Sequence, residues 1–240
     1  MQITGKLAKK ACSNAAEPAV TIAFLGDSVT QGCFELIERN DTGFTTVHDR
    51  QHAYPALVER ILSVLYPTVP VNILHAGVAG QSAADALGRL ETDVIAHRPD
   101  LTVVCFGLND CGRGMQELAK YTEPLEEIFT RLENAGSEII FLTPNMMSTG
   151  ISPHLNGGMF REIAQDTSRF QNGGVLRQYV DAAAELCRKR GIPVCDCYEK
   201  WELLWKNGVD VTELLSNRIN HPTREMHWLF AVSLVETMMR

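Results

Sequence analysis

The sequence predicts an α/β fold, a three-layer α/β/α sandwich around a five-stranded parallel sheet. Five short runs rich in Val, Ile, Leu and Phe recur along the 240 residues, and each is followed by Gly, Pro or Asp. Their nearly continuous apolar character is typical of parallel strands that are covered on both faces. Segments with helical spacing separate the runs, and parallel strands that alternate with helices form a doubly wound sheet with right-handed crossovers.

The expected strands end where loops with glycine and polar residues begin. In chain order the strands are VTIAFLGD (20–27), VNILHAG (71–77), LTVVCFG (101–107), EIIFLTP (138–144) and IPVCD (192–196). Ligands of such sheets bind beyond the carboxyl ends of the strands. The breaks GDS, AGVAG, GLND and TPN are therefore where function is expected.

Helices are expected between these strands, because apolar residues there repeat at intervals of three and four. The expected helices are 54–66, 82–97, 116–136, 176–191 and a last helix in 221–240 with Pro222 near its first turn. The connections 33–53 and 145–174 are too long to be simple turns, and at least one is expected to shape the substrate pocket. We expect one domain over residues 1–240, in which residues 1–18 are a flexible or loosely attached segment.

Composition and charge exclude several classes of function. The chain has 45% hydrophobic and 21% charged residues, which is ordinary for a globular protein. A net charge of -7 provides no basic face for nucleic acid, so neither DNA nor RNA is expected as a partner. No apolar run approaches the roughly 18 residues of a membrane-spanning helix. A signal peptide needs an uninterrupted apolar stretch near the start of the chain, and residues 11–14 (ACSN) stand where that stretch would be. We therefore expect a cytoplasmic protein.

The seven cysteines do not form a spaced disulfide framework, and we interpret them as reduced thiols. Cys195 and Cys197 lack the matching pair that a structural zinc site requires, so no metal site is expected. The GVAG stretch resembles half of a dinucleotide fingerprint without its remaining glycine and without a P-loop lysine. A nucleotide-binding module of the same architecture is therefore a less favoured alternative.

Ser28 follows the first strand and is a candidate nucleophile, which requires a histidine base elsewhere in the chain. His221 is the candidate, because it directly precedes Pro222 in a loop that can reach the same edge of the sheet. The remaining histidines are assigned to a strand, to helices or to the two long connections: His75, His97, His227, His48, His52 and His154.

Acyl transfer also needs hydrogen-bond donors where negative charge develops on the carbonyl oxygen. Gly77 follows the second strand and has no side chain to block its N–H, and Asn109 follows the third and carries an amide NH₂. Alternatively, Gly77 satisfies a tight turn and Asn109 caps the next segment. We interpret Asp27 as a cap or turn residue that holds the bend, and Asp110 in the same way.

Four blocks together resemble those of the SGNH hydrolases, also called the GDSL esterase/lipase family: GDSVTQG, AGVAGQS, GLND and NHP, in the family's order between residues 24 and 222. The resemblance implies that Ser28 is the nucleophile, His221 the base, and that the Ser28 N–H, the Gly77 N–H and the Asn109 side chain form the oxyanion hole. It also implies the flavodoxin-like strand order 2-1-3-4-5 and catalysis without a metal or organic cofactor.

One position departs from the family's pattern. Members commonly carry an aspartate three residues before the histidine, and Arg218 stands there in this chain. We expect a Ser-His dyad in which either a backbone carbonyl or the Asn217 side-chain oxygen accepts from Nδ1–H of His221.

The family includes carbohydrate deacetylases, lysophospholipases and thioesterases. We expect a serine esterase that acts on a small-molecule substrate, a short-chain, acetyl ester of a carbohydrate or similar polar alcohol, because the chain is acidic and shows no amphipathic lipid-facing segment. The alternatives are a lysophospholipase or thioesterase, and a non-catalytic ligand-binding protein of the same fold.

Overall fold

A parallel sheet forms the middle layer of the computed structural model, which describes residues 1–39, 43–155 and 158–240. Its strands are β1 (Val20–Gly26), β4 (Val71–Gly77), β5 (Leu101–Cys105), β6 (Glu138–Leu142) and β7 (Val194–Cys195). They lie in the order β4-β1-β5-β6-β7, and all neighbouring pairs are parallel. Counted along the chain this order is 2-1-3-4-5, so the predicted sheet and its flavodoxin-like order are confirmed.

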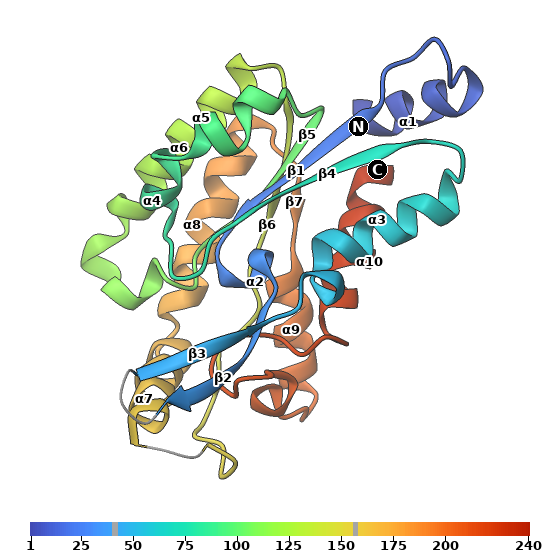
Figure 1. Cartoon of the computed structure of the whole chain (residues 1–240). Helices are drawn as coiled ribbons and strands as arrows, with labels where there is room; N and C mark the ends of the chain where they lie inside the picture. Colours follow the sequence, from blue (N-terminus) through green and yellow to red (C-terminus); the bar gives the residue numbers. More distant parts are fainter. Residues whose placement is uncertain (40–42, 156–157) are drawn as a thin grey trace.

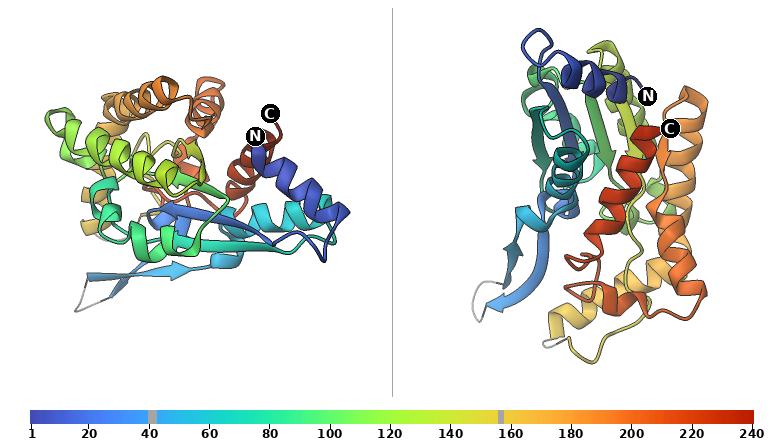
Figure 2. Two further views of the ribbon diagram at one scale, coloured as in Figure 1. Left: turned by 90° about the horizontal axis from the view of Figure 1, so that it is seen from above. Right: turned by 90° about the vertical axis from the view of Figure 1, so that its right-hand side faces the viewer.

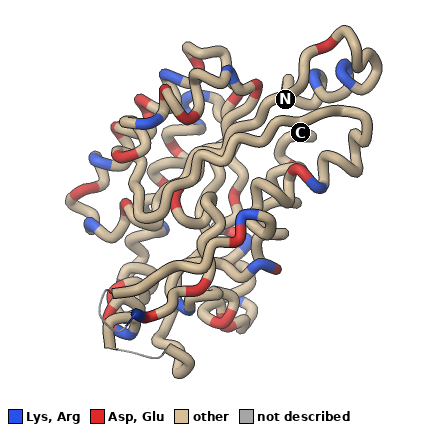
Figure 3. The backbone as a smooth tube through the Cα atoms, viewed as in Figure 1, with Lys and Arg blue, Asp and Glu red and all other residues tan. Residues whose placement is uncertain are grey.

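Helices cover both faces of this sheet (Figure 1, Figure 2). One layer contains α1 (Gln2–Cys12), α3 (Tyr54–Leu65) and α10 (His227–Met239), and the other contains α4 (Ala83–Leu87), α5 (Leu90–Asp93), α6 (Ala119–Asn134) and α8 (Val175–Arg190). Because both faces are covered, the central strand β5 is buried at every residue, which accounts for its continuous apolar sequence. Acidic and basic residues are interspersed along the outer helices (Figure 3).

Local signals explain where several helices begin and end. Ser82 and Asp85 form a reciprocal capping box at the start of α4. Helix α8 ends at Gly191, which adopts the left-handed conformation at φ 69° that glycine favours at a helix end. The helix predicted over 82–97 is instead divided at Gly88 into α4 and α5, since glycine disfavours a helix interior.

The last helix begins later than the sequence predicted. Helix α10 starts at His227, and Pro222 forms an isolated antiparallel bridge with Leu215 instead of opening the helix. Residues 215–222 therefore form a loop that is held in place before the helix begins. This loop carries His221.

The N-terminal segment is packed against the body of the protein. Ile3 and Leu7 of α1 are both buried, and they lie on one face because they are four residues apart. The N–H groups of Gln2 and Ile3 donate to the carboxylate of Glu138, at the start of β6. The expected loose attachment of residues 1–18 is therefore wrong for α1, whose two core contacts are too few to stand out among its lysines in the sequence.

The two long connections contain a two-stranded antiparallel sheet and a helix that lie outside the three main layers. The first contains the antiparallel strands β2 (Cys33–Arg39) and β3 (Gly43–His48), and the second contains α7 (Gly158–Asn172), while residues 156–157 lie outside the described part. Phe160 of α7 and Phe44 of β3 contact each other edge to face, with ring centroids 5.9 Å apart. None of the helices in the described ranges is long and apolar enough to cross a membrane.

Candidate active site

Ser28 lies at the sharp junction between β1 and α2 (Ser28–Gln31). Glycine is required two residues before it, because a Cβ on Gly26 would lie 2.0 Å from Oγ1 of Thr30 and 2.9 Å from the carbonyl oxygen of Cys105. Asp27 is the N-cap of α2, and its Oδ1 accepts from the Val29 N–H at 2.9 Å. The carboxylate thus holds the bend, as the sequence predicted for it.

His221 reaches Ser28 across 193 residues of sequence, with 3.0 Å between its Nε2 and the Ser28 Oγ. Its Nδ1 lies 3.0 Å from the backbone carbonyl oxygen of Phe34. A carbonyl oxygen only accepts, so Nδ1 carries the hydrogen and the lone pair of Nε2 faces the serine hydroxyl. This is the tautomer that a general base for Ser28 requires.

The surroundings of His221 keep the ring neutral and able to accept a proton. The side chain is 6% exposed, and burial is the main cause that lowers its pKa below the usual value. The nearby His48 lowers this pKa further, whereas the Phe34 carbonyl and the charge of Glu35 act in the opposite direction. Below neutral pH the ring therefore remains a base over a wider range than an exposed histidine does.

Asn217 does not contact the imidazole, so its expected role as acceptor for Nδ1–H is corrected. Its Oδ1 accepts from the backbone N–H groups of Ile219, Asn220 and His221, at 3.0, 2.9 and 2.9 Å. A side-chain oxygen that satisfies three successive amides fixes a tight turn. Asn217 thus holds the loop, while the other predicted alternative, a backbone carbonyl, contacts the ring.

Arg218 stands where the family commonly has the aspartate, and it is directed to other partners. Its guanidinium lies 3.1 Å from the carboxylate of Glu213, and its backbone is left-handed at φ 57°. The Asn220 carbonyl in the same loop accepts from Nδ2 of the buried Asn145, at 2.9 Å. Asn145 follows β6 within the predicted TPN break, and the position of that break is the one signal in the sequence that points to it.

Gly77 is not among the residues that line the cavity beside Ser28, although the sequence analysis placed it in the oxyanion hole. A Cβ on Gly77 would lie 2.3 Å from the backbone nitrogen of Gln31 and 2.7 Å from the carbonyl carbon of Thr30, so Gly77 permits α2 to pack on β4. Gly80, three residues later, lines the cavity that contains Ser28. The expectation that Gly77 faces the site is therefore corrected; the AGVAG block contains two glycines, and the second of them reaches the cavity.

Asn109 lines the same cavity as Ser28, His221 and Gly80. One hydrogen of its amide donates to the carbonyl of Gln81 at 2.9 Å, which orients the NH₂ group and leaves its second hydrogen. In the described part of the chain no protein acceptor takes the N–H of Ser28 or of Gly80. Three donors are thus gathered around one space.

Asp110 connects the loops that carry these donors. Its carboxylate accepts from the N–H groups of Ala83 and Gly107, at 3.0 and 3.1 Å. Burial raises the pKa of Asp110 to about 6 and that of Asp27 to about 7. Both buried carboxylates hold backbone rather than face the cavity, which agrees with the interpretation made from the sequence.

The cavity beside Ser28 has a volume of about 330 Å³. The first long connection contributes Leu36, Phe44 and Thr46, and the second contributes Ile163 from α7. Ile219 adds another apolar side chain from the histidine loop. The prediction that a long connection shapes the pocket is confirmed by this lining.

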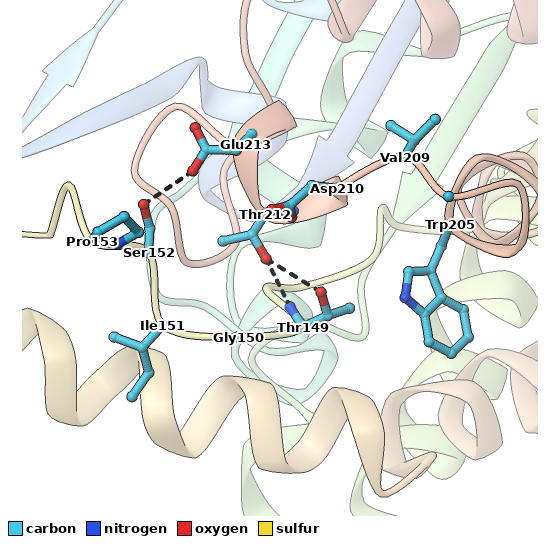
Figure 4. Close-up of a pocket in the computed structure, with 11 residues that line it drawn as sticks. Thr149, Gly150, Ile151, Ser152, Pro153, Trp205, Val209, Asp210, Thr212 and Glu213 are labelled. Atoms are coloured by element: carbon cyan, nitrogen blue, oxygen red, sulfur yellow. Dashed lines mark hydrogen bonds between the residues drawn. The ribbon is translucent and has the colours of Figure 1, made fainter.

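A second cavity, of about 360 Å³, lies between residues 149–153 and 205–213 (Figure 4). Its polar side chains are already engaged, because Ser152 donates to Glu213 at 3.0 Å and the Thr149 N–H donates to Thr212 at 3.1 Å. Trp205 stands at its edge. No serine–histidine pair lies among the residues that line it, so the chemistry belongs to the first cavity.

The other candidates for chemistry lie elsewhere. His227 is fully buried, its Nδ1 accepts from the Tyr54 N–H at 3.0 Å, and burial lowers its pKa to about 3. It is a core residue of α10, the helix in which the sequence predicted it. All seven cysteines are free, and no group of three potential metal ligands occurs within the described ranges.

Known proteins similar to this chain include esterases of acetylated xylan. An acetylxylan esterase from Geobacillus stearothermophilus is 28% identical over 162 residues, which are 61% of this chain and 72% of that protein. A solved acetyl-xylooligosaccharide esterase from the same source has a TM-score of 0.68 at 21% identity, covering 91% of this chain and 94% of that one. A further acetyl xylan esterase structure has a TM-score of 0.67 at 20% identity, covering 90% and 98%. At these identities the solved structures establish the shared fold.

The family assignment comes from the sequence profile described as GDSL-like Lipase/Acylhydrolase, which matches residues 24–229. The match includes the end of the first strand, Ser28, the two glycines, Asn109 and the histidine loop. The chain belongs to this family, the SGNH hydrolases, and is a carboxylic ester hydrolase.

Proposed function

We propose that this esterase hydrolyses a short-chain ester, an acetyl ester of a carbohydrate or similar polar alcohol, through an acyl-enzyme at Ser28. The observation that carries the proposal is the contact of 3.0 Å between Ser28 Oγ and His221 Nε2, with Nδ1–H held by the Phe34 carbonyl. The acetyl and carbohydrate parts rest on the similarity to the acetylxylan esterase.

The chemistry has two halves. Ser28 Oγ attacks the ester carbonyl carbon while Nε2 of His221 takes the hydroxyl proton, and the same proton then passes to the departing alcohol as the C–O bond breaks. Water, deprotonated by Nε2, next attacks the acyl carbon, and the bond to Ser28 Oγ breaks as Oγ takes the proton back from Nε2 and the acid leaves. The N–H groups of Ser28 and Gly80 and the amide of Asn109 are the donors we assign to the oxyanion.

The Phe34 carbonyl replaces only part of what the missing aspartate supplies. In a serine protease, turning the triad aspartate into asparagine costs about 10⁴ in rate, because the histidine adopts the wrong tautomer. A carbonyl keeps the correct tautomer, so that loss is avoided. It lacks a full negative charge, however, and therefore stabilises the imidazolium less than a carboxylate does.

A longer acyl chain is the second candidate, favoured by the apolar wall of the cavity. Leu36, Phe44, Ile163 and Ile219 all line the space beside Ser28, more apolar surface than an acetyl group needs. Medium-chain substrates of this kind correspond to the lysophospholipase or thioesterase alternative. A purely non-catalytic binding protein is disfavoured, because the serine and the base are in contact in the productive tautomer.

A chain-length series separates the two candidates. Nitrophenyl acetate, butyrate and octanoate are compared by kcat/KM, together with acetate release from acetylated xylo-oligosaccharides. We expect the acetate ester to be preferred and the oligosaccharide to be deacetylated, with Ser28→Ala inactive on all substrates. A clear preference for octanoate would overturn the acetyl assignment, and full activity in Ser28→Ala would overturn the mechanism.

A further inference from the structure

We propose that Arg224 is a positioning residue for His221: by clamping the start of β2 onto the histidine loop, it fixes the Phe34 carbonyl that takes the place of the family's aspartate. This inference rests on the proposed function, because it assigns how the base of that reaction is held. It concerns a residue outside the four sequence blocks. Three observations carry it.

The first observation is an irregularity in β2. The register of β2 against β3 shifts between Cys33 and Leu36, so the two intervening residues, Phe34 and Glu35, face a single residue of β3. Such a β-bulge disrupts the ladder locally and redirects backbone groups, and bulges are common beside active sites. The carbonyl that accepts from His221 therefore belongs to a residue of the bulge.

The second observation is the set of contacts made by Arg224, three residues after His221. Its guanidinium binds both oxygens of Glu35, at 2.6 and 3.2 Å, and its Nε donates to Asp49 at 2.8 Å. The same guanidinium lies over the ring of Phe34, 4.3 Å from its centroid. Arg224 thus holds the side chains of both bulge residues and the end of β3 at once.

The third observation is that these contacts lie on both sides of the peptide unit whose carbonyl accepts from His221. The carbonyl of Phe34 belongs to the peptide unit between Phe34 and Glu35, and both of their side chains are fixed by one guanidinium. A planar, bidentate fork restricts orientation more than a single charge does. The Phe34 ring also packs against His227, with ring centroids 5.0 Å apart.

The charges around His221 give the clamp a signature in the pH profile. His48 from β3 lowers the pKa of His221, and Glu35 from β2 raises it. Burial lowers the pKa of His227 from α10, and Arg224 is paired with both Glu35 and Asp49. Removing the Glu35 charge should move the acid limb of kcat/KM to lower pH, whereas removing the Arg224 charge, which leaves Glu35 unpaired, should move it to higher pH.

The test compares Arg224→Met, Arg224→Lys and Glu35→Gln with the wild type on a nitrophenyl ester. We expect Arg224→Met to lower kcat about 10- to 100-fold with KM within about twofold, as for other groups that orient a functional side chain. Arg224→Lys keeps the charge without the fork and should lose less. The two acid limbs should shift in opposite directions, which general destabilisation does not produce.

Arg177→Met is the matched control, because Arg177 also binds two carboxylates and lies over an aromatic ring: Glu202 at 3.1 Å, Asp181 at 2.8 Å and Tyr198 at 5.9 Å. Equal losses in Arg177→Met and Arg224→Met, or unchanged kcat and acid limb in Arg224→Met, would overturn the inference. If Arg224→Met does not fold, Glu35→Gln decides, because it removes the carboxylate that the guanidinium binds, and an unchanged kcat overturns the inference. Failure of the proposed function appears separately, as hydrolysis that Ser28→Ala retains.

Discussion

Gly77→Ala tests whether Gly77 serves packing or catalysis. The added Cβ would lie 2.3 Å from the Gln31 nitrogen and 2.8 Å from its Cα, and both are backbone atoms of α2. Backbone cannot rotate away as a flexible side chain can, so α2 must shift. Reaching an ordinary contact of 3.4 Å requires a movement of about 1 Å.

The size of the effect follows from that movement. Overpacking of this kind costs about 1–3 kcal/mol of unfolding free energy. For a chain of this length each kcal/mol lowers the melting temperature by about 2–4 °C, so a decrease of about 2–12 °C is expected. Ser28 begins α2, and a misplacement of about 1 Å in a catalytic group is worth up to about 100-fold in kcat.

Thermal unfolding and nitrophenyl acetate hydrolysis are measured together, with Gly112→Ala as the control. A Cβ on Gly112 would meet no atom within 4 Å and its φ is not positive, so its replacement should leave the melting temperature nearly unchanged. If Gly77→Ala lost activity at an unchanged melting temperature, the added methyl group would disturb the site without disturbing the packing, and the packing argument would be refuted. Unchanged stability and activity would refute it as well.

Three further predictions concern the supports of the site. Asn217→Ala leaves three backbone amides without their acceptor and should lower the unfolding free energy, measured with denaturant, by about 1–3 kcal/mol. Asn217→Asp keeps the acceptor and should lose less. Equal losses in the two variants would contradict the turn role. Asn109→Ala removes a donor that we assign to the oxyanion and should lower kcat about 10²- to 10³-fold with KM little changed, and a loss confined to KM would argue against that role. The pKa of Asp27, raised from 3.8 to about 7, means that the folded state retains a proton that the unfolded state releases, so wild-type stability falls as pH rises from about 4 to about 7. Asp27→Asn should remove this contribution, at most about 4 kcal/mol, and a stability difference from wild type that does not change across that pH range would contradict it.

The parallel sheet and the serine–histidine pair were predictable from repeated patterns and ordered motifs in the sequence, and the strand order followed from the resemblance to the SGNH hydrolases. A strand that is covered on both faces is apolar along its whole length, and β5 is buried at every residue. His221 could be chosen among seven histidines because it stands in a loop before proline. The contact of 3.0 Å with Ser28 agrees with that choice.

What the sequence did not reveal depends on packing in three dimensions. The carbonyl of Phe34 carries no side-chain signature, since any residue has one, and its availability arises from a bulge in β2. The choice between Gly77 and Gly80 depends on how closely α2 approaches β4, which local sequence does not encode. The polar side chain of Asn217 suggested a contact with the imidazole, but its oxygen is fully used by its own turn.

The most direct measurement is covalent labelling of Ser28 by an alkyl phosphonate nitrophenyl ester, followed by intact mass and peptide mapping. An activated serine attacks such a reagent and retains the phosphonyl group. We predict one added group, located on Ser28, with no labelling in Ser28→Ala and labelling slowed strongly in His221→Ala. A label on another residue, or equal labelling rates in wild type and His221→Ala, would contradict the claim that His221 activates Ser28.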